Sequence, residues 1–295
     1  MIRQAATAAV IAALFGLPPN AYAEQYRYSM AARVRPFVLF WISRSGVGTA
    51  TVTRQCSSEW TRYSLLIGTD PERAPRRINR WGYVEEDIRG AEAHLIGLMT
   101  QSDEESIEQA DASLRAQAAG RHPFKVIQAT IADDHATSRV ATIAAPADYT
   151  FRDVGAALDL ARRESSGGKS RVISMPRGTR PGFLAALADA IHSRSSTPVT
   201  YVYHGRLYEL RQTRIETIAN FRIGASAYGN AATGDFVVTS LYDGEQTRFS
   251  ITYGIAGRLA DVPIKVTYQP RWWMQVELTL DDAGNRRPLA GGVGP

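Results

Sequence analysis

The sequence predicts an α+β protein, a twisted antiparallel sheet or half-barrel with a mixed α/β insertion in the middle of the chain. Three observations lead to this class. Segments of alternating polar and apolar residues recur at both ends of the mature chain, short turns join them, and the middle contains two stretches of helical periodicity. Connections this short favour antiparallel pairing, because parallel neighbours require long crossovers.

The first twenty-three residues have the layout of a secretory signal peptide. A positive Arg3 precedes an apolar run at 5–17, and Ala21 and Ala23 form a small-x-small cleavage site. As a helix this run would extend about 20 Å, which is less than the roughly 30 Å hydrocarbon core of a bilayer. We therefore expect cleavage rather than a retained anchor, and a protein exported to the periplasm or the medium. Export excludes ATP, NAD and cytosolic nucleic acid as ligands.

Residues 24–284 are expected to form a single large domain, followed by a flexible tail at 285–295. The chain is 44% hydrophobic and 21% charged, near globular averages, and no later segment approaches the ~20 apolar residues of a spanning helix. The pI of about 9.4 is open to two interpretations: an anionic partner, such as lipid head groups or an acidic envelope polymer, or a soluble surface, since the charge comes mostly from scattered arginines. Cys56 is the only cysteine, so no internal disulfide can form, and a buried thiol is expected.

The first part of the sheet is expected from residues 34–100. Phe37–Ile42 is apolar on both faces and predicts a covered strand or one that lines an apolar cavity. Gly46-Val47-Gly48 is expected to break the chain after it. Four more strands follow, with a basic loop at 71–81 between the second and third: Thr49–Gln55, Tyr63–Ile67, Trp81–Ile88 and Ala91–Thr100.

Residues 101–198 are expected to form the α/β insertion. Ser102 and Glu105 have capping-box spacing and predict an exposed helix that ends at Gly120. Thr179 is the expected N-cap of the last helix, whose apolar stripe includes Phe183, Leu184, Leu187 and Ile191. Between these helices the pattern predicts a hairpin of Phe124–Ala132 and Thr137–Ala145, a helix at Asp153–Glu164 and a strand at Arg171–Met175.

The second part of the sheet is expected from residues 199–281. Turns at His204-Gly205 and Asp243-Gly244 predict two hairpins. The clearest strand is Trp272–Asp281, in which apolar and polar residues alternate over its whole length. The remaining strands are expected at Val199–Tyr203, Leu207–Thr213, Phe236–Tyr242, Thr247–Tyr253 and Ile264–Tyr268.

No pattern favours a catalytic site, a metal site or a cofactor. The segment 166–170 lacks the first glycine of a phosphate-binding loop and follows a helix instead of a strand. Asp133-Asp134-His135 is expected at a hairpin tip, where adjacent side chains diverge, and Gly224–Tyr228 lacks the last glycine of a hydrolase elbow. A carboxylate pair or serine triad assembled by the fold stays open as an alternative.

Aromatic residues near the two ends of the mature chain are the candidate ligand-binding residues. Two interpretations are open: an ordinary sheet core, or a concave sheet face that binds an apolar ligand. Adjacent Trp272 and Trp273 point to opposite faces of a strand, so one of them belongs outside the main core. The candidates are Phe40, Trp41, Tyr268, Trp272, Trp273 and Met274.

Two segments carry a resemblance to known proteins. Phe37–Ile42 followed by Gly46–Val52, and Val262–Val266 running into Pro270–Trp273, resemble the ends of uncharacterised exported β-rich bacterial proteins. Those proteins are similar in fold to the periplasmic lipoprotein carriers, which are half-open antiparallel barrels with helices across the mouth. The resemblance covers about thirty residues and implies no catalytic residue. The middle of the chain departs from it with two extra helices and a hairpin.

These features predict a non-catalytic binding protein of the cell envelope, with a lipid or another apolar or acylated molecule as its ligand. Two alternatives remain. One is an envelope hydrolase acting on polysaccharide or ester. The other is a scaffold in an envelope complex, which would meet a protein partner through the Arg73–Arg80 loop or a tryptophan. No cofactor, metal ion or nucleic-acid partner is expected.

Overall fold

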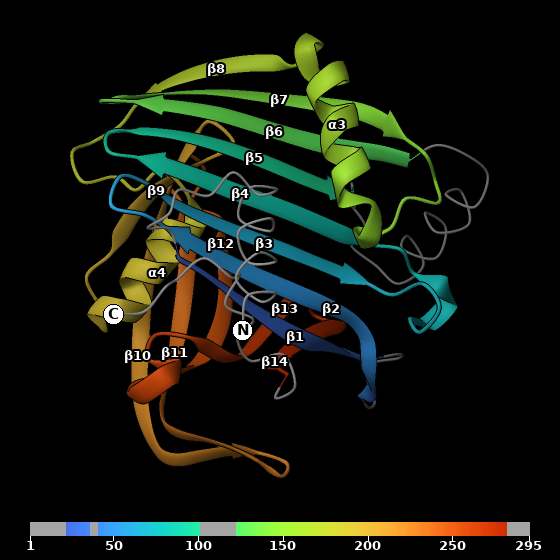
Figure 1. The fold of residues 1–295 in the computed structure, drawn as a ribbon, viewed down its shortest axis with the longest axis vertical. Coiled ribbons are helices and arrows are strands. Elements are labelled where there is room, and N and C mark those ends of the chain that lie inside the picture. Colours follow the sequence, from blue (N-terminus) through green and yellow to red (C-terminus); the bar gives the residue numbers. More distant parts are fainter. Residues whose placement is uncertain (1–21, 36–40, 101–121, 282–295) are drawn as a thin grey trace, which may run out of the picture.

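One large antiparallel sheet dominates the computed structural model, which describes residues 22–35, 41–100 and 122–281. Its fourteen strands have the spatial order β8-β7-β6-β5-β4-β3-β2-β1-β14-β13-β12-β11-β10-β9 (Figure 1). The strands are β1 (Tyr22–Val34), β2 (Ile42–Cys56), β3 (Thr61–Thr69), β4 (Trp81–Arg89), β5 (Glu92–Thr100), β6 (His122–Ala132), β7 (His135–Ala145), β8 (Lys169–Ser174), β9 (Val199–Tyr203), β10 (Arg206–Ile223), β11 (Ser226–Ser240), β12 (Gln246–Gly254), β13 (Pro263–Arg271) and β14 (Met274–Leu280).

The sheet is a meander with one long-range seam. Almost all neighbouring strands are also consecutive in the chain, but β1 pairs with β14 through seven residue pairs, from Tyr28 with Leu280 to Val34 with Met274. The two outer strands, β8 and β9, do not pair with each other, so the sheet stays open. The antiparallel sheet of the prediction is confirmed, with a larger share of strand than expected.

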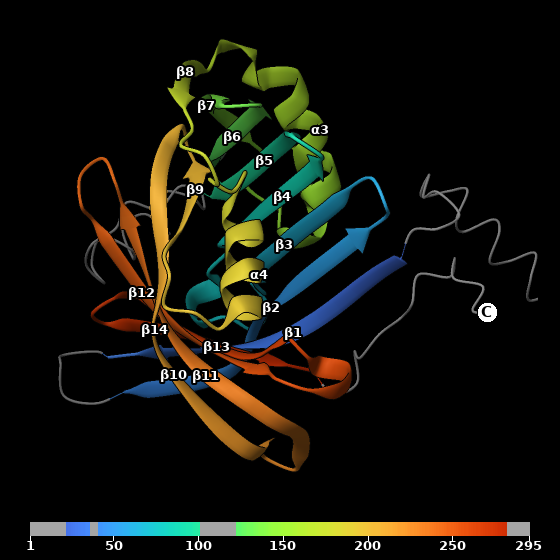
Figure 2. The same ribbon diagram turned by 90° about the vertical axis from the view of Figure 1, so that its left-hand side faces the viewer.

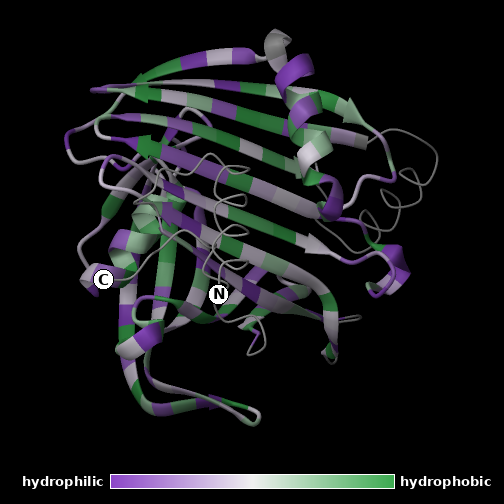
Figure 3. Cartoon of the chain, in the orientation of Figure 1, coloured by the Kyte–Doolittle hydropathy of each residue, from purple (hydrophilic) through white to green (hydrophobic). Residues whose placement is uncertain are grey.

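Two α-helices cover opposite faces of the sheet. On β3, Leu66 packs against the cluster that contains helix α3 (Val154–Glu164), while its neighbours Leu65 and Ile67 face the side of helix α4 (Phe183–Ser193). Figure 2 shows α4 within the concavity and α3 outside it. The residues along the strands alternate in hydropathy, as the two faces require (Figure 3).

The sheet curls so strongly that its β9–β10 end packs against the concave face of β5, β6 and β7. Val202 of β9 and Leu207 of β10 lie in one buried cluster with residues of β5, β6 and β7, among them Leu95 and Ala129. Leu95 is paired with Glu86, whose carboxylate meets α4, so this cluster lies on the concave side. The concavity is therefore enclosed by both halves of the sheet.

The first part of the sheet corrects three expectations. The sheet begins at Tyr22 rather than at residue 34, because β1 precedes the strands that the sequence suggested. Residues 46–48 do not break the chain; they lie inside β2, where a bulge opposite Met30 and Ala31 absorbs them. Trp41 and Ile42 are exposed near the β1–β2 turn instead of covered, and the rest of the Phe37–Ile42 run lies outside the described residues.

The middle of the chain contributes strands to the same sheet as well as helices. β6, β7 and β8 continue the strand order beyond β5, close to the predicted hairpin and strand, and α3 begins one residue after the predicted start. The interpretation of residues 101–198 as an insertion stays a prediction. Short 3-10 turns lie at Pro75–Arg77, Phe151–Asp153, Ser165–Gly167 and Gly257–Leu259. The helix predicted at 102–120 and the tail at 285–295 fall outside the described residues.

Two expectations about element ends are wrong. Thr179 does not cap α4, because its hydroxyl donates to the carbonyl of Pro176 and the N-cap position is Gly182. Trp272 is not on a strand: β13 ends at Arg271 and β14 starts at Met274, so the two tryptophans form the turn between them. The prediction that one of the pair lies outside the core is confirmed, since Trp272 is 56% exposed and Trp273 is 7% exposed.

Candidate functional site

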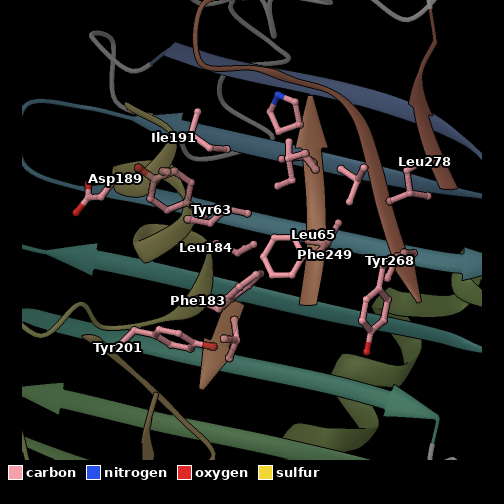
Figure 4. A pocket seen from close by; sticks show the side chains of 18 of the residues that line it. Tyr63, Leu65, Phe183, Leu184, Asp189, Ile191, Tyr201, Phe249, Tyr268 and Leu278 are labelled. Carbon is pink, nitrogen blue, oxygen red and sulfur yellow. The ribbon is translucent and has the colours of Figure 1, made fainter. Parts of the chain in front are cut away.

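A cavity of about 870 Å³ lies between α4 and the concave face of the sheet. Strands from both halves of the sheet line it, including β1, β2 and β3 on one side and β9 to β14 on the other. Figure 4 shows Leu65, Phe249 and Leu278 converging on it from three strands, with Phe183 and Leu184 of α4 beside them. The cavity is therefore a product of the curl of the whole sheet.

Its walls are mainly apolar. Strand alternation explains the set, because every second residue of a strand faces the concavity: Tyr63, Leu65 and Ile67 on β3 are one such series. Helix α4 contributes residues three or four positions apart, as a single helix face does. The valine, leucine, isoleucine and phenylalanine residues of the wall are Val52, Leu65, Ile67, Phe183, Leu184, Leu187, Ile191, Val238, Phe249, Ile251, Val262, Val266, Val276 and Leu278.

Tyrosines add neutral hydroxyl groups to this wall. The rings of Tyr201 and Tyr208 stack with centroids 5.5 Å apart, and the Tyr28 hydroxyl donates to the carbonyl of Pro263 at 2.9 Å. Burial raises the pKa of Tyr28, Tyr201 and Tyr203 above the usual tyrosine value. These side chains therefore stay uncharged in neutral solution and keep the interior of the cavity suited to an apolar guest.

A buried carboxylate holds the N-terminal end of α4. Glu86 of β4 is 0% exposed and accepts hydrogen bonds from the backbone N–H groups of Leu184 at 2.7 Å and Ala185 at 2.9 Å. These are groups that a helix start leaves without intrahelical partners. Burial raises the pKa of Glu86 to about 7, although the two N–H groups act in the opposite direction.

The other end of α4 is held by the loop between β12 and β13. Asp261 accepts from His192 Nδ1 at 2.7 Å and forms an ion pair with Arg194 at 3.3 Å. Arg194 has the left-handed backbone conformation that ends a helix. Glu86 and Asp261 belong to opposite halves of the sheet. Helix α4 therefore spans the concavity, with one end bound to each half.

Charged and polar lining residues lie at two sides of the cavity. One group contains Glu24, Arg54, Tyr63 and Asp189, and the other contains Glu245 with Tyr268. Figure 4 shows Asp189 and Tyr268 on opposite sides. The Arg54 guanidinium lies 5.9 Å from the centroid of the Tyr63 ring. Arg54, Glu245 and His192 are all exposed, so the cavity wall reaches solvent near each of them. We refer to the solvent-exposed side at Arg54 as the opening.

His204 lines the cavity near the β9–β10 turn. Its ring stacks on that of Tyr203 with centroids 4.0 Å apart, and its Nε2 atom is buried without a hydrogen-bond partner among the described residues. Burial lowers the pKa of His204 to about 3, and the positive charges of Lys125 and Arg206 act in the same direction. His204 is therefore a neutral polar group at neutral pH.

The structure places one candidate residue from the sequence, Tyr268, on the cavity wall. Trp41 and Trp272 are exposed, Trp273 is buried, and Met274 is partly buried; none of these four lines the cavity. They gather at the shared end of the β1–β2 and β13–β14 turns, where the Arg35 guanidinium lies 5.9 Å from the Trp41 ring and the Arg35 N–H donates to the Trp273 carbonyl. Phe40 lies outside the described residues.

The sequence predicted the apolar face of α4 but not the strand residues that lie opposite it. The alternation of Tyr63, Leu65 and Ile67 was visible, yet alternation alone does not say which face of a strand becomes concave. Arg54 gave no signal, because it is a single charged residue in a predicted strand. Glu86 lies between two other acids, Glu85 and Asp87, and such a run predicts an exposed face, whereas the structure buries Glu86. Their roles follow from the curl of the sheet and the position of α4.

The other patterns of interest lie away from the cavity. Asp134 and His135 are in contact at the tip of the β6–β7 hairpin, and the Ser165–Gly167 turn follows α3 and precedes β8, which is the reverse of the order in a phosphate-binding loop. Cys56 is buried, as expected. Within the described ranges, no three His, Cys, Asp or Glu side chains are grouped so that they could hold a metal ion. No helix in the described part of the chain is long and apolar enough to span a bilayer.

Comparison with protein-family models, curated proteins and solved structures found no match.

Proposed function

We propose that this protein is a non-catalytic binding protein of the cell envelope whose cavity holds a lipid or another apolar or acylated ligand. The observation that carries the proposal is the cavity itself. Its volume of about 870 Å³ lies within the range of roughly 300–1,000 Å³ that is typical of small-molecule sites, and its interior wall is aliphatic and aromatic.

The driving force for such a ligand is the removal of apolar surface from water. Each buried methylene group contributes about 0.8 kcal/mol, so an acyl chain of a dozen carbons gains roughly 10 kcal/mol before the costs of association. The wall offers hydroxyls of tyrosines and few charges, so the cavity favours a chain over a polar solute. Helix α4 covers the chain and keeps water out.

The first test is displacement of a neutral fluorescent apolar probe, N-phenyl-1-naphthylamine, together with native mass spectrometry of protein purified from its own host. Leu65→Trp places a large side chain in the cavity and is expected to abolish probe binding. Because the cavity offers space, this change is expected to cost less than the 1–3 kcal/mol typical of overpacking in a filled core. Val172→Trp, at a residue exposed on β8, is the matched control.

Two results would contradict the proposal. One is a wild-type protein that neither binds the probe nor retains a co-purified apolar molecule. The other is a Leu65→Trp variant that unfolds while Val172→Trp does not, since that outcome means that the space around Leu65 is already filled.

Export is the second part of the proposal, and it is supported by the layout of residues 1–23. Cleavage after Ala23 would remove only the first two residue pairs between β1 and β2, those of Tyr22 and Ala23. N-terminal sequencing of the protein from the envelope fraction is expected to start at Glu24. An intact Met1 on a cytosolic product would contradict this part.

A further inference from the structure

We infer that the ligand is an anionic amphiphile: its acyl chain fills the cavity, and its oxyanion head group, a carboxylate or a phosphate, binds the guanidinium of Arg54 at the opening. This inference rests on the proposed function, since it assigns a head group to a ligand whose chain that function requires.

Arg54 is the single Lys or Arg among the described residues that line the cavity. It lies near the end of β2 on the concave face and is exposed at the opening. Within the described part of the chain it has no ion-pair partner; its guanidinium lies over the Tyr63 ring, 5.9 Å from the centroid. The Arg54 guanidinium also contacts the Cys56 side chain, but among the described residues it forms no ion pair with a carboxylate. A guanidinium has five N–H donors, so those not directed at Cys56 can bind an oxyanion with two parallel hydrogen bonds.

The acids around this opening are mostly engaged elsewhere. Asp189 is paired with Arg180, and Asp261 with His192 and Arg194. Glu245 lies by Tyr268, on the other side of the cavity from Asp189. Glu24 is the acid nearest to Arg54 in the register, because it is directly opposite Arg54 in the β1–β2 pair. Its charge weakens the attraction of Arg54 for an anion.

The register defines the path of the chain from the head group inward. Arg54 is paired with Tyr63, and the next inward-facing pair is Val52 with Leu65. Beyond it lies Ile67, the last of the inward-facing series on β3. A ligand anchored at Arg54 thus meets only apolar side chains along β2 and β3 as its chain enters.

The test compares ligands that share a sixteen-carbon chain and differ in the head group, each used below its micelle concentration to displace N-phenyl-1-naphthylamine. The ligands are palmitic acid, hexadecyl phosphate, hexadecanol and hexadecyltrimethylammonium. The wild-type protein is expected to bind at least one of the two anions about tenfold more tightly than the alcohol, which corresponds to one charge-assisted interaction. The preference is expected to shrink at high salt, because the opening is exposed.

Variants separate Arg54 from general charge effects. Arg54→Gln is expected to reduce the affinity for the anion to that for the alcohol, and Arg54→Lys to keep part of the preference. Glu24→Gln is expected to strengthen anion binding. Arg27→Gln is the matched control, because Arg27 is exposed and lies between the cavity-facing Tyr26 and Tyr28, so its side chain is on the outer face.

The outcomes distinguish this inference from the proposed function. If hexadecanol displaces the probe as well as both anions do, or if Arg27→Gln lowers anion binding as much as Arg54→Gln, the head-group assignment is wrong and the apolar site stands. If no ligand displaces the probe and the probe itself does not bind, both fail. A preference for only one of the two anions identifies the source of the oxyanion as a fatty acid or a phosphate-bearing lipid.

Discussion

At the scale of single residues, the buried carboxyl group of Glu86 is expected to make the stability of the fold depend on pH. Its carboxylate lies in the sheet interior and accepts two backbone N–H groups from the helix start. Burial raises its pKa to about 7 from an ordinary value of 4.5, so the folded chain holds a proton that the unfolded chain has released between these two values. The stability of the fold is therefore expected to fall as the pH rises through this window.

The pH dependence can be measured by urea unfolding at pH 5, 6, 7 and 8. The difference between the two pKa values corresponds to about 3 kcal/mol, which is the largest loss of unfolding free energy that this one carboxyl group can cause over the window. Glu86→Gln, which cannot titrate, is expected to flatten the profile, whereas Glu92→Gln at an exposed position is expected to leave it unchanged. Parallel profiles for the wild type and Glu86→Gln would show that Glu86 does not cause the pH dependence.

Gly182 offers a second test of the same contact. A Cβ at this position would lie 2.3 Å from the Cδ and Oε1 atoms of Glu86, closer than any real contact. Gly182→Ala is therefore expected to displace either the carboxylate or the helix start and to lower the unfolding free energy by about 1–3 kcal/mol. Gly155→Ala in α3 is the control, because its added methyl group meets open space and alanine favours a helix. Equal stabilities of the two variants, measured by thermal unfolding, would show that Glu86 does not hold the helix tightly.

These residue-level features are beyond what a sequence can reveal. Glu86 occupies an ordinary position in a strand that was predicted correctly, and its importance comes from a helix about a hundred residues later in the chain. The expectation that Thr179 caps α4 failed for the same reason: local rules look for a cap just before the helix, whereas here a carboxylate from another strand accepts the N–H groups.

At the scale of elements, α4 depends on its contacts at both ends more than on its length. It is an eleven-residue helix, and an isolated helix this short is marginal in water. Its inner face packs on Tyr201, Leu210, Phe236 and Ile251, while Glu86 and Asp261 fix its ends. The end held by Asp261 is the more exposed of the two, since the His192 side chain is largely in solvent.

Loosening that end is expected to change dynamics more than stability. Asp261→Asn keeps a residue that tolerates the positive φ at this position while removing the negative charge that Arg194 and His192 meet. Exposed ion pairs contribute about 1 kcal/mol or less, so the unfolding free energy should change little. Hydrogen exchange of the last turn of α4, followed by mass spectrometry, should become several-fold faster. Unchanged exchange would mean that packing alone holds this turn.

The sequence predicted most elements but missed β1 and placed the start of β14 two residues too early. Alternation identified β3 to β7 and the β9–β10 and β11–β12 hairpins because each has one face in the core. It did not identify the hairpin between β10 and β11, whose residues 214–223 and 226–235 the sequence left unassigned. The prediction missed β1 although Tyr26, Tyr28 and Met30 alternate with polar residues, because β1 starts inside the predicted signal peptide and its alternation is short. Trp272 was predicted on a strand because the alternating pattern continues through the two-residue turn and so does not reveal it.

At the scale of the whole molecule, the cavity provides space for a ligand at the expense of packing contacts in the core. Side chains around Leu65, Phe249 and Leu278 line a space where a protein core would normally be filled, so the empty protein lacks the dispersion contacts of a packed interior. A ligand that fills this space is expected to stabilise the fold. The sequence left a concave, ligand-binding sheet face open as one of two interpretations. It could not place the wall of the cavity, because strands from both halves of the sheet come together there only through the curl of the sheet.

Ligand binding should therefore raise the thermal midpoint. At a free concentration a hundred times its Kd, N-phenyl-1-naphthylamine is expected to add about 2.7 kcal/mol to the unfolding free energy, or roughly 5 °C in Tm. Scanning calorimetry with and without the probe measures this shift. Leu65→Trp should show no shift, and a wild-type midpoint that does not respond to saturating probe would argue against an internal site.

The seam between β1 and β14 has a consequence for biosynthesis. A ribosome releases the strand with Tyr28 long before the strand with Leu280, yet these two must lie side by side. Until β14 is available, the outer edge of β1 has unpaired backbone N–H and C=O groups, which can pair with a strand of another polypeptide. Folding of this protein is therefore expected to benefit from a chaperone that covers β1 until β14 has been synthesised.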